Sequence, residues 1–214
     1  MLIPFTAEAL IAYCVVLLLC LPLHEFGHAW MAARLGDVVA EREGRLTLNP
    51  AAHIDPLGAI LLAIGGFGWA KPVPFNPYGL RKAPSTSVGI ILVSAAGPAT
   101  NLLLALIATI PFRLKLVSVF DVAADKPLAM VLYTILSINL VLAVFNLIPI
   151  PPLDGSKILA SLLPPQFSNV MNFVEQYGMF LLILLIVPIF GGSSLASILI
   201  SPIVLDLTRV LLGF

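Results

Sequence analysis

Apolar residues occur in long runs along this chain, and charged residues gather between the runs. Most of the runs are close to the ~20 residues that an α-helix needs to cross the hydrocarbon core of a bilayer. They lie at about 7–35, 88–112, 128–148, 177–190 and 195–212. The last two, which flank Gly191-Gly192, could form one span or two, and two are favoured. The pattern therefore predicts five membrane-spanning helices.

Shorter elements are expected between the spans. Residues 36–55 mix charge with short alternation around Gly44, which predicts a small β element after the first span. The apolar run 56–70 contains several glycines and is only ~15 residues long, so it favours a re-entrant or interfacial segment. A short helix is expected from Asp154 to about Leu163.

The composition indicates a membrane protein and argues against a nucleic-acid partner. Hydrophobic residues make up 60% of the chain and charged residues only 10%, with a mean hydropathy of +1.08, which departs from the balance of globular domains. We therefore expect an all-α polytopic membrane protein, with 1–214 forming one membrane-embedded domain in the lipid bilayer. Eleven basic residues balance eleven acidic ones without a basic cluster, which argues against a nucleic-acid partner. The amino terminus lacks the basic region and cleavage site of a secretory signal, so we expect it to be retained as the first span.

The basic residues predict the orientation, because loops rich in Lys and Arg stay on the cytoplasmic side. Six of them lie between the first and second spans and three between the second and third. The larger group is Arg34, Arg42, Arg45, Lys71, Arg81 and Lys82, and the smaller is Arg113, Lys115 and Lys126. The first span then enters from outside, and both its polar residues and the segment around Asp154 are expected toward the cytoplasmic side.

Polar residues inside the first span have the spacing of a metal site. His24-Glu25-Phe26-Gly27-His28 is a His-Glu-x-x-His pattern, which stacks both imidazoles on one helical face, where they can hold zinc. Glu25 projects about 100° away and can act as the base that takes a proton from water and passes it to the leaving amine. Packed polar residues filling gaps between helices are the alternative. Each ionisable group in a span costs on the order of 2.5–3.5 kcal/mol, however, which favours a functional cluster.

A catalytic zinc ion needs a third protein ligand, and Asp154 is the best-placed acidic residue. Prolines in the preceding segment should stop the helix and leave an extended stretch lining a polar cavity at membrane depth. Asp154 is also a good helix N-cap, and the two roles are compatible.

Three further polar residues are candidates. The amide of Asn101 could stabilise the oxyanion of a tetrahedral intermediate or could simply hold helices together, and Asn139 fits the second role better. His53 could approach the metal or the substrate, or it could make a local hydrogen bond in its loop.

These motifs resemble the site-2 protease family of intramembrane zinc metalloproteases, and the likeness covers most of the chain. The motifs occur in order as 24–28, Gly97-Pro98-Ala99-Thr100-Asn101, and 146–155 ending in Leu153-Asp154-Gly155. The chain is similar to the short, minimal form without PDZ or CBS domains.

The resemblance implies a three-span catalytic core followed by additional C-terminal spans. It implies that His24, His28 and Asp154 bind one zinc ion per chain, that Glu25 activates water and that Asn101 assists the transition state. Asn146, which opens the third motif, is a candidate residue beside the site or the substrate.

The implied substrates are membrane-spanning proteins whose helices unwind before cleavage. In bacteria and archaea such enzymes process anti-sigma factors, signal peptides or other membrane regulators, which implies a prokaryotic cell membrane. A homo-oligomer or a regulatory membrane partner is also compatible with the sequence.

Alternative functions stay open at this point. Intramembrane His, Glu and Asp residues could form the translocation site of a metal transporter or channel, or the chain could be a scaffold without turnover. Other divalent metals could occupy the same ligands. If the chain is a protease, a strand edge in 38–48 or the loop 71–79 could pair with the unwound substrate.

Overall fold

The computed structural model describes residues 11, 14–65, 68–123, 126–190 and 192–213. Five of its helices are long and apolar enough to cross a membrane, judged by length and composition. They are Val16–Arg34, formed by the π-helix η1 (Val16–Cys20) and α2 (Leu21–Arg34), α5 (Thr86–Arg113), α7 (Pro127–Asn146), α9 (Ser168–Ile186) and α10 (Leu195–Leu212). The expectation of an all-α polytopic membrane protein is confirmed.

Short elements connect these helices. They are α3 (Val39–Arg42), η2 (Pro50–Ala52), α4 (Pro56–Gly65), η3 (Pro77–Gly79), α6 (Val119–Ala123), α8 (Asp154–Leu162), η4 (Pro165–Phe167), and the paired strands β1 (Pro188–Phe190) and β2 (Ser193–Ser194). The helix expected after Asp154 is α8.

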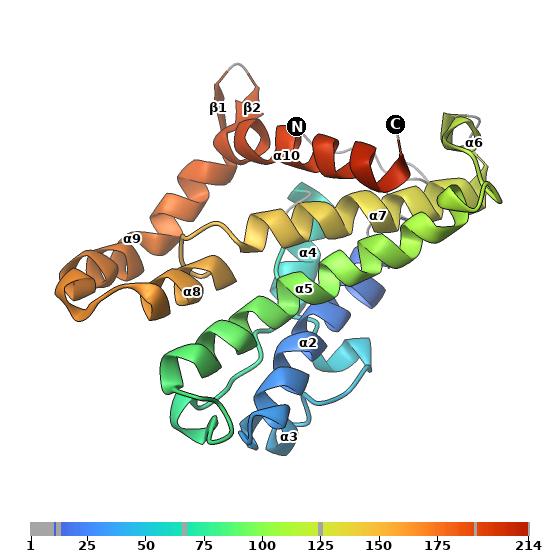
Figure 1. The fold of residues 1–214 in the computed structure, drawn as a ribbon. Helices are drawn as coiled ribbons and strands as arrows, with labels where there is room; N and C mark the ends of the chain where they lie inside the picture. The colour runs from blue at the N-terminus through green and yellow to red at the C-terminus, as the bar shows by residue number, and fades with distance from the viewer. Residues whose placement is uncertain (1–10, 12–13, 66–67, 124–125, 191, 214) are drawn as a thin grey trace.

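Helices α5 and α7 form the centre of the molecule and run side by side in opposite directions (Figure 1). Ala105 and Ala108 of α5 meet Leu136 and Leu140 of α7 in a buried cluster, so small side chains on one helix accommodate large ones on the other. Helix α2 crosses α5 on one side, and α10 packs along α7 on the other. This arrangement brings the first span, the second span and the start of α8 together.

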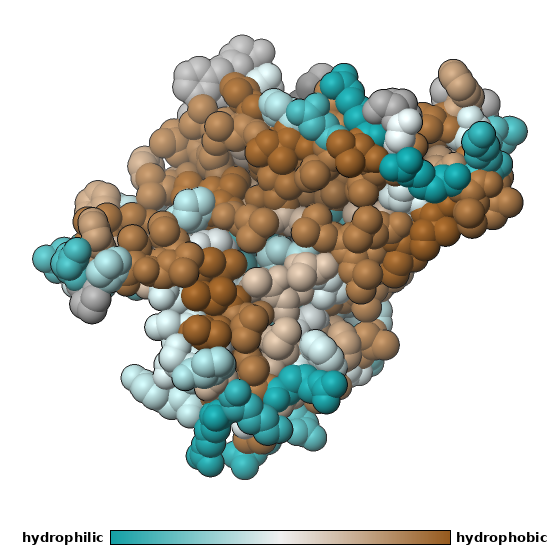
Figure 2. All heavy atoms as spheres, viewed as in Figure 1, coloured by the Kyte–Doolittle hydropathy of each residue, from teal (hydrophilic) through white to brown (hydrophobic). Residues whose placement is uncertain are grey.

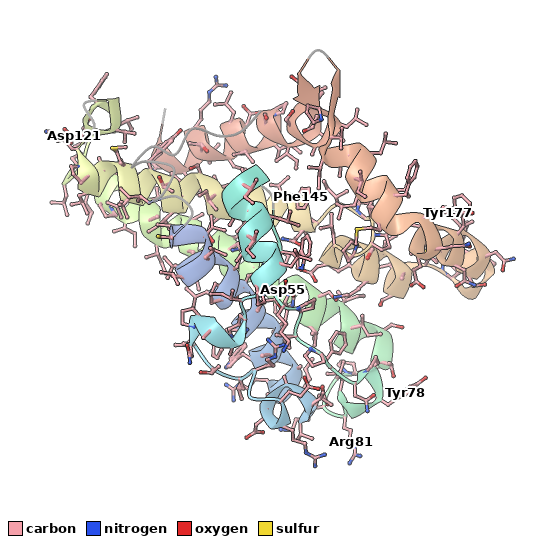
Figure 3. All side chains as sticks on the ribbon, turned by 180° about the vertical axis from the view of Figure 1, so that it is seen from behind. Asp55, Tyr78, Arg81, Asp121, Phe145 and Tyr177 are labelled. Atoms are coloured by element: carbon pink, nitrogen blue, oxygen red, sulfur yellow. The ribbon has the colours of Figure 1, made fainter. Side chains whose placement is uncertain are left out.

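The face drawn in Figure 2 is apolar over the middle of the molecule and polar at its ends. On α5, for example, the outward-facing Leu103, Leu106, Ile107 and Ile110 are all exposed. Arg81 and Asp121 mark opposite ends of this apolar region (Figure 3). Such a distribution suits a molecule whose middle is surrounded by lipid chains.

The β element expected in 36–55 is wrong. Residues 39–42 form the helical turn α3, because the N–H groups of Arg42 and Glu43 donate to carbonyl oxygens four residues earlier. Asp37 starts this turn by accepting a hydrogen bond from Val39 N at 3.3 Å, and Gly44, with φ of +68°, follows it. Local hydrogen bonds therefore outweigh the short alternation. The strand pairing that the structure does describe is β1 with β2 and an isolated bridge between Ile54 and Ala70.

The bounds of two other segments also differ from expectation. The span expected at 177–190 is α9, which begins at Ser168 and ends at Ile186, so a polar first half belongs to the helix. In the segment 56–70, α4 has 10 residues, which corresponds to about 15 Å and is too short to cross a bilayer. A re-entrant segment there stays a prediction, and residues 66–67, like 7–10 and 12–13 of the first span, lie outside the described part.

Candidate metal centre

His24, His28 and Asp154 meet inside the helix bundle. The Nε2 atoms of the two histidines, which lie one turn apart on α2, are 3.1 Å from each other. Asp154 Oδ2, at the start of α8, lies 3.2 Å from Nε2 of His24 and 3.1 Å from Nε2 of His28. All three residues are buried, with 5–7% of their surface exposed. Residues 126 positions apart in sequence thus form one compact triad.

A hydrogen bond from Nδ1 of each imidazole determines which ring nitrogen carries the proton and which carries the lone pair. His28 Nδ1 donates to the carbonyl oxygen of Val93 at 2.7 Å, and His24 Nδ1 donates to Asn101 Oδ1 at 2.6 Å. A neutral imidazole that donates through Nδ1 has a lone pair on Nε2. Both Nε2 lone pairs therefore face each other and the carboxylate of Asp154.

Three electron-rich atoms this close repel one another unless a cation lies between them. Distance alone would make Asp154 an ion-pair partner of both histidines, yet within the described residues its Oδ2 is buried and has no properly directed hydrogen bond. Four-coordinate zinc, with bonds of about 2.0–2.1 Å, places its ligand atoms about 3.3 Å apart. The observed 3.1–3.2 Å separations fit that donor set.

Gly97 makes room for the two imidazoles against α5. A Cβ at this position would collide with Nε2 of His28 and would lie 2.6 Å from Cε1 of His24. Pro98 follows in the same turn and has no N–H, so the carbonyl oxygen of Ser94, next to Val93, lacks its usual helical donor. Gly97 of the second motif is therefore part of the wall of the candidate metal centre.

Asp154 reaches the histidines because the chain folds back tightly after α7. A Cβ on Gly155 would collide with the carbonyl oxygen of Leu147, so only glycine permits this close return. Leu153 occupies the N-cap of α8, which places Asp154 inside the first turn and not at the cap position. Its second oxygen, Oδ1, lies 3.6 Å from Nζ of Lys157.

Glu25 is held by a loop that the sequence did not single out for this role. Its Oε2 accepts a hydrogen bond from the backbone N–H of Val73 at 3.1 Å, and the side chain is half-buried. Val73 lies between Pro72 and Pro74, neither of which has an N–H. The N–H of Val73 is therefore the single backbone donor of residues 72–74, and it donates to Glu25. Three prolines in the stretch 72–77 were the available signal for a rigid, extended segment.

Asn101 of α5 lies behind His24 and faces α7. Its Oδ1 faces Nδ1 of His24, and its Nδ2 donates to Asn139 Oδ1 at 2.7 Å. Both asparagines are fully buried. These contacts favour a role in orienting His24 over the oxyanion role that the sequence suggested for Asn101.

His53 and Asn146 are placed outside the triad. Nε2 of His53 donates to the carbonyl oxygen of Thr47 at 2.8 Å, within its own loop, which is the local hydrogen bond considered from the sequence. Asn146 donates through Nδ2 to Leu142 of its own helix at 3.0 Å and is half-buried at the end of α7.

Comparison with known proteins identifies the family. The model of Peptidase family M50 matches residues 111–185, a segment that includes Asp154. The chain is 38% identical over 195 residues to "Putative zinc metalloprotease YwhC" of Bacillus subtilis, covering 87% of this chain and 85% of that protein. The chain belongs to peptidase family M50, the site-2 protease family. No solved structure matches it.

Other M50 relatives agree with this assignment. "Putative zinc metalloprotease Rip2" of Mycobacterium tuberculosis is 34% identical over 185 residues, and the match covers 82% of this chain and 66% of that protein. The chain is thus a zinc metalloprotease with membrane-spanning helices, which confirms the resemblance seen in the three motifs.

A cleft of about 260 Å³ in this M50 protease is lined by residues that precede and follow Asp154 in the sequence. Its lining residues come from the loop that holds Glu25, from the segment before α8, from α8 and from α9. They are Pro72, Pro151, Pro152, Ser156, Lys157 and Glu175. The cleft therefore lies between the loop that contacts the candidate base and the helix that carries the third candidate ligand.

Proposed function

We propose that this M50 protease hydrolyses peptide bonds in or near the membrane-spanning segments of other membrane proteins. His24, His28 and Asp154 would hold one zinc ion per chain. The observation that carries the proposal is the convergence of their three electron-rich atoms within 3.2 Å, buried among apolar helices. Such a cluster costs free energy in a span unless it holds a cation.

The donor set favours zinc. Two imidazole nitrogens and one carboxylate oxygen are ligands that catalytic zinc sites use, with one position left without a protein atom. When bound, zinc would lower the pKa of water and polarise the scissile carbonyl group.

Glu25 would act as the base. It precedes Phe26-Gly27-His28 on the same helix and is held by Val73, outside the triad itself. It would accept the proton of the attacking water and transfer it to the leaving amine. Asn101 would act on the reaction through His24, and Asn146 stays a candidate for substrate contact.

The cleft between Pro72 and α8 would receive the substrate in extended form. A hydrogen-bonded helix shields its backbone carbonyl groups, so the substrate must unwind before attack. The strand edge once expected in 38–48 is a helical turn, which leaves the loop 71–79 as the candidate for pairing with the unwound substrate.

We place the metal centre on the cytoplasmic side of a prokaryotic cell membrane. Arg81 lies at the polar end where α2 finishes and α5 begins (Figure 3). Between these two helices or at their ends, Arg34, Arg42 and Lys82 are also exposed. His28 precedes Arg34 by less than two helical turns. Positively charged loops favour the cytoplasm.

Cleavage of a panel of single-span membrane proteins tests the proposal. Purified wild type and Glu25→Gln would be compared in liposomes, and bound zinc would be measured for both. We expect wild type to cut and Glu25→Gln to retain zinc without cutting. Zinc binding with equal inertness of both proteins across the panel would contradict the proposal and make metal flux through liposomes the next measurement.

Cross-linking tests the substrate route separately. In a Cys14→Ser background, a cysteine at Glu175 in the cleft should form a disulfide with a substrate cysteine placed near the cleaved bond. A cysteine at the outward-facing Ile107 is the matched control and should not. Equal cross-linking at both positions would contradict the assignment of the cleft.

A further inference from the structure

A chain of buried hydrogen bonds runs from His24 to the backbone of α7. His24 Nδ1 lies 2.6 Å from Asn101 Oδ1, and Asn101 Nδ2 lies 2.7 Å from Asn139 Oδ1. Asn139 Nδ2 then lies 2.8 Å from the carbonyl oxygen of Ile135 and 3.1 Å from Sγ of Cys20. Asn101, Asn139 and Cys20 are fully buried, so water does not compete for these contacts.

The direction of this chain is set at its α7 end. A backbone carbonyl can only accept a hydrogen bond, so Asn139 must turn its Nδ2 toward Ile135 and its Oδ1 toward Asn101. Asn101 must then present Nδ2 to Asn139 and Oδ1 to His24. Because Oδ1 can only accept, the proton of neutral His24 must sit on Nδ1, and the lone pair must sit on Nε2, beside Asp154.

We propose that Asn139 is a positioning residue for His24 that acts through Asn101 and determines the tautomer in which His24 faces the metal. This inference rests on the proposed zinc site. On this proposal, Asn139 orients His24 in addition to holding α7 against the neighbouring helices. Hydrogen-bond partners of metal-binding histidines commonly change metal affinity or activity by about 10- to 100-fold when they are removed.

Two contacts distinguish this role from packing. The packing of α7 on α5 rests on Leu136 and Leu140, which belong to an apolar cluster with Ala105 and Ala108. Asn139 is not part of that cluster, and its side-chain amide instead forms hydrogen bonds with Asn101 and with the carbonyl oxygen of Ile135. Substitutions on α7 can therefore separate the loss of apolar packing, at Leu140, from the loss of the hydrogen bonds, at Asn139.

Zinc affinity and thermal stability of the purified full chain test the proposal. Asn139→Leu keeps the number and branching of the side-chain heavy atoms but has no polar atoms, and we expect zinc affinity, measured by competition with a chromophoric chelator, to fall about 10- to 100-fold. Leu140→Ala is the matched control: it should lower the melting temperature of the metal-free protein and leave zinc affinity unchanged. Unchanged zinc affinity in Asn139→Leu would overturn the proposal.

A double-mutant cycle tests the route through Asn101. If Asn139 acts through Asn101, the double variant Asn101→Leu/Asn139→Leu should bind zinc as weakly as Asn101→Leu alone. Additive losses would show that Asn139 acts independently and would overturn the proposal.

Asn139→Asp decides the question if Asn139→Leu does not fold. In its neutral form, an aspartic acid can donate to Ile135 and accept from Asn101 with the shape of asparagine. We expect zinc affinity close to wild type, and a loss of affinity with an unchanged melting temperature would overturn the proposal. Failure of wild type itself to bind zinc would instead refute the zinc site.

Discussion

The backbone N–H of Val73 donates a hydrogen bond to Oε2 of Glu25 at 3.1 Å, although 48 residues separate them. Hydrogen bonds on both sides of Val73 fix the position of this loop. Lys71 N donates to the carbonyl oxygen of His53 at 2.8 Å, and Asn76 N donates to Oδ2 of the buried Asp37 at 2.9 Å. The candidate base is thus oriented by a loop whose own position depends on two distant contacts.

Removal of this donor should impair cleavage without removing zinc. Val73→Pro lacks the N–H, and a hydrogen bond to a charged group contributes about 1.5–3 kcal/mol, so we expect cleavage to slow by about 10-fold or more. Zinc content should stay that of wild type, because Val73 is not one of the three candidate ligands.

Val73→Ala is the control for this prediction. It shortens the side chain and keeps the N–H, so its cleavage rate should stay within about twofold of wild type. Equal rates for the proline and alanine variants would mean that the hydrogen bond to Glu25 does not matter for cleavage.

Gly97→Ala should weaken zinc binding by steric displacement of the histidines. The added Cβ would lie 2.6 Å from Cε1 of His24 and closer still to Nε2 of His28, so both rings must move. We expect zinc affinity to fall more than 10-fold, since the ligand geometry must be held to a few tenths of an ångström. Ala99→Val adds bulk to the exposed face of the same turn and should bind zinc normally; normal zinc affinity in Gly97→Ala would refute the placement of the rings.

Substitutions of Asp154 and of Lys157 should have very different effects on zinc affinity. Asp154→Asn removes the charge that faces both histidines, and we expect zinc affinity to fall at least 100-fold. Lys157 contacts the other carboxylate oxygen at 3.6 Å and its side chain is 44% exposed. A pair of this kind contributes about 0–1 kcal/mol, so Lys157→Met should change zinc affinity by less than about fivefold. Chelator competition on both variants measures the contrast, and similar losses would contradict it.

Arg113 should stabilise the protein without affecting the metal centre. Its guanidinium group donates from Nε to the carbonyl oxygen of Leu211 at 2.5 Å and from Nη2 to that of Val210 at 2.6 Å, which caps the end of α10. Arg113→Met should lower the free energy of unfolding by about 1 kcal/mol, because these contacts are exposed. A lower melting temperature with unchanged zinc affinity is the expected result, whereas a loss of zinc would imply coupling between the two ends of α5.

The sequence by itself determined the class of fold and the main polar residues of the site. Long apolar runs predict spans because a helix of about 20 residues must satisfy its own backbone hydrogen bonds in lipid. The spacing of His24 and His28 places both on one face of a helix, which is a local property. The motif around Asp154 could be recognised because its prolines and glycine impose a specific local backbone.

Only the tertiary structure decided how these residues work together. The turn at 39–42 depends on Asp37, which also holds Asn76, so its alternating pattern did not lead to a strand. Glu25 meets Val73, and Asn101 meets both His24 and Asn139, through contacts between segments far apart in the chain. Periodicity and motif spacing describe neighbours along a helix, whereas the direction of a hydrogen bond between helices depends on how those helices pack. For that reason the sequence identified Asn101 as important, and the packing of α2, α5 and α7 revealed its position behind His24.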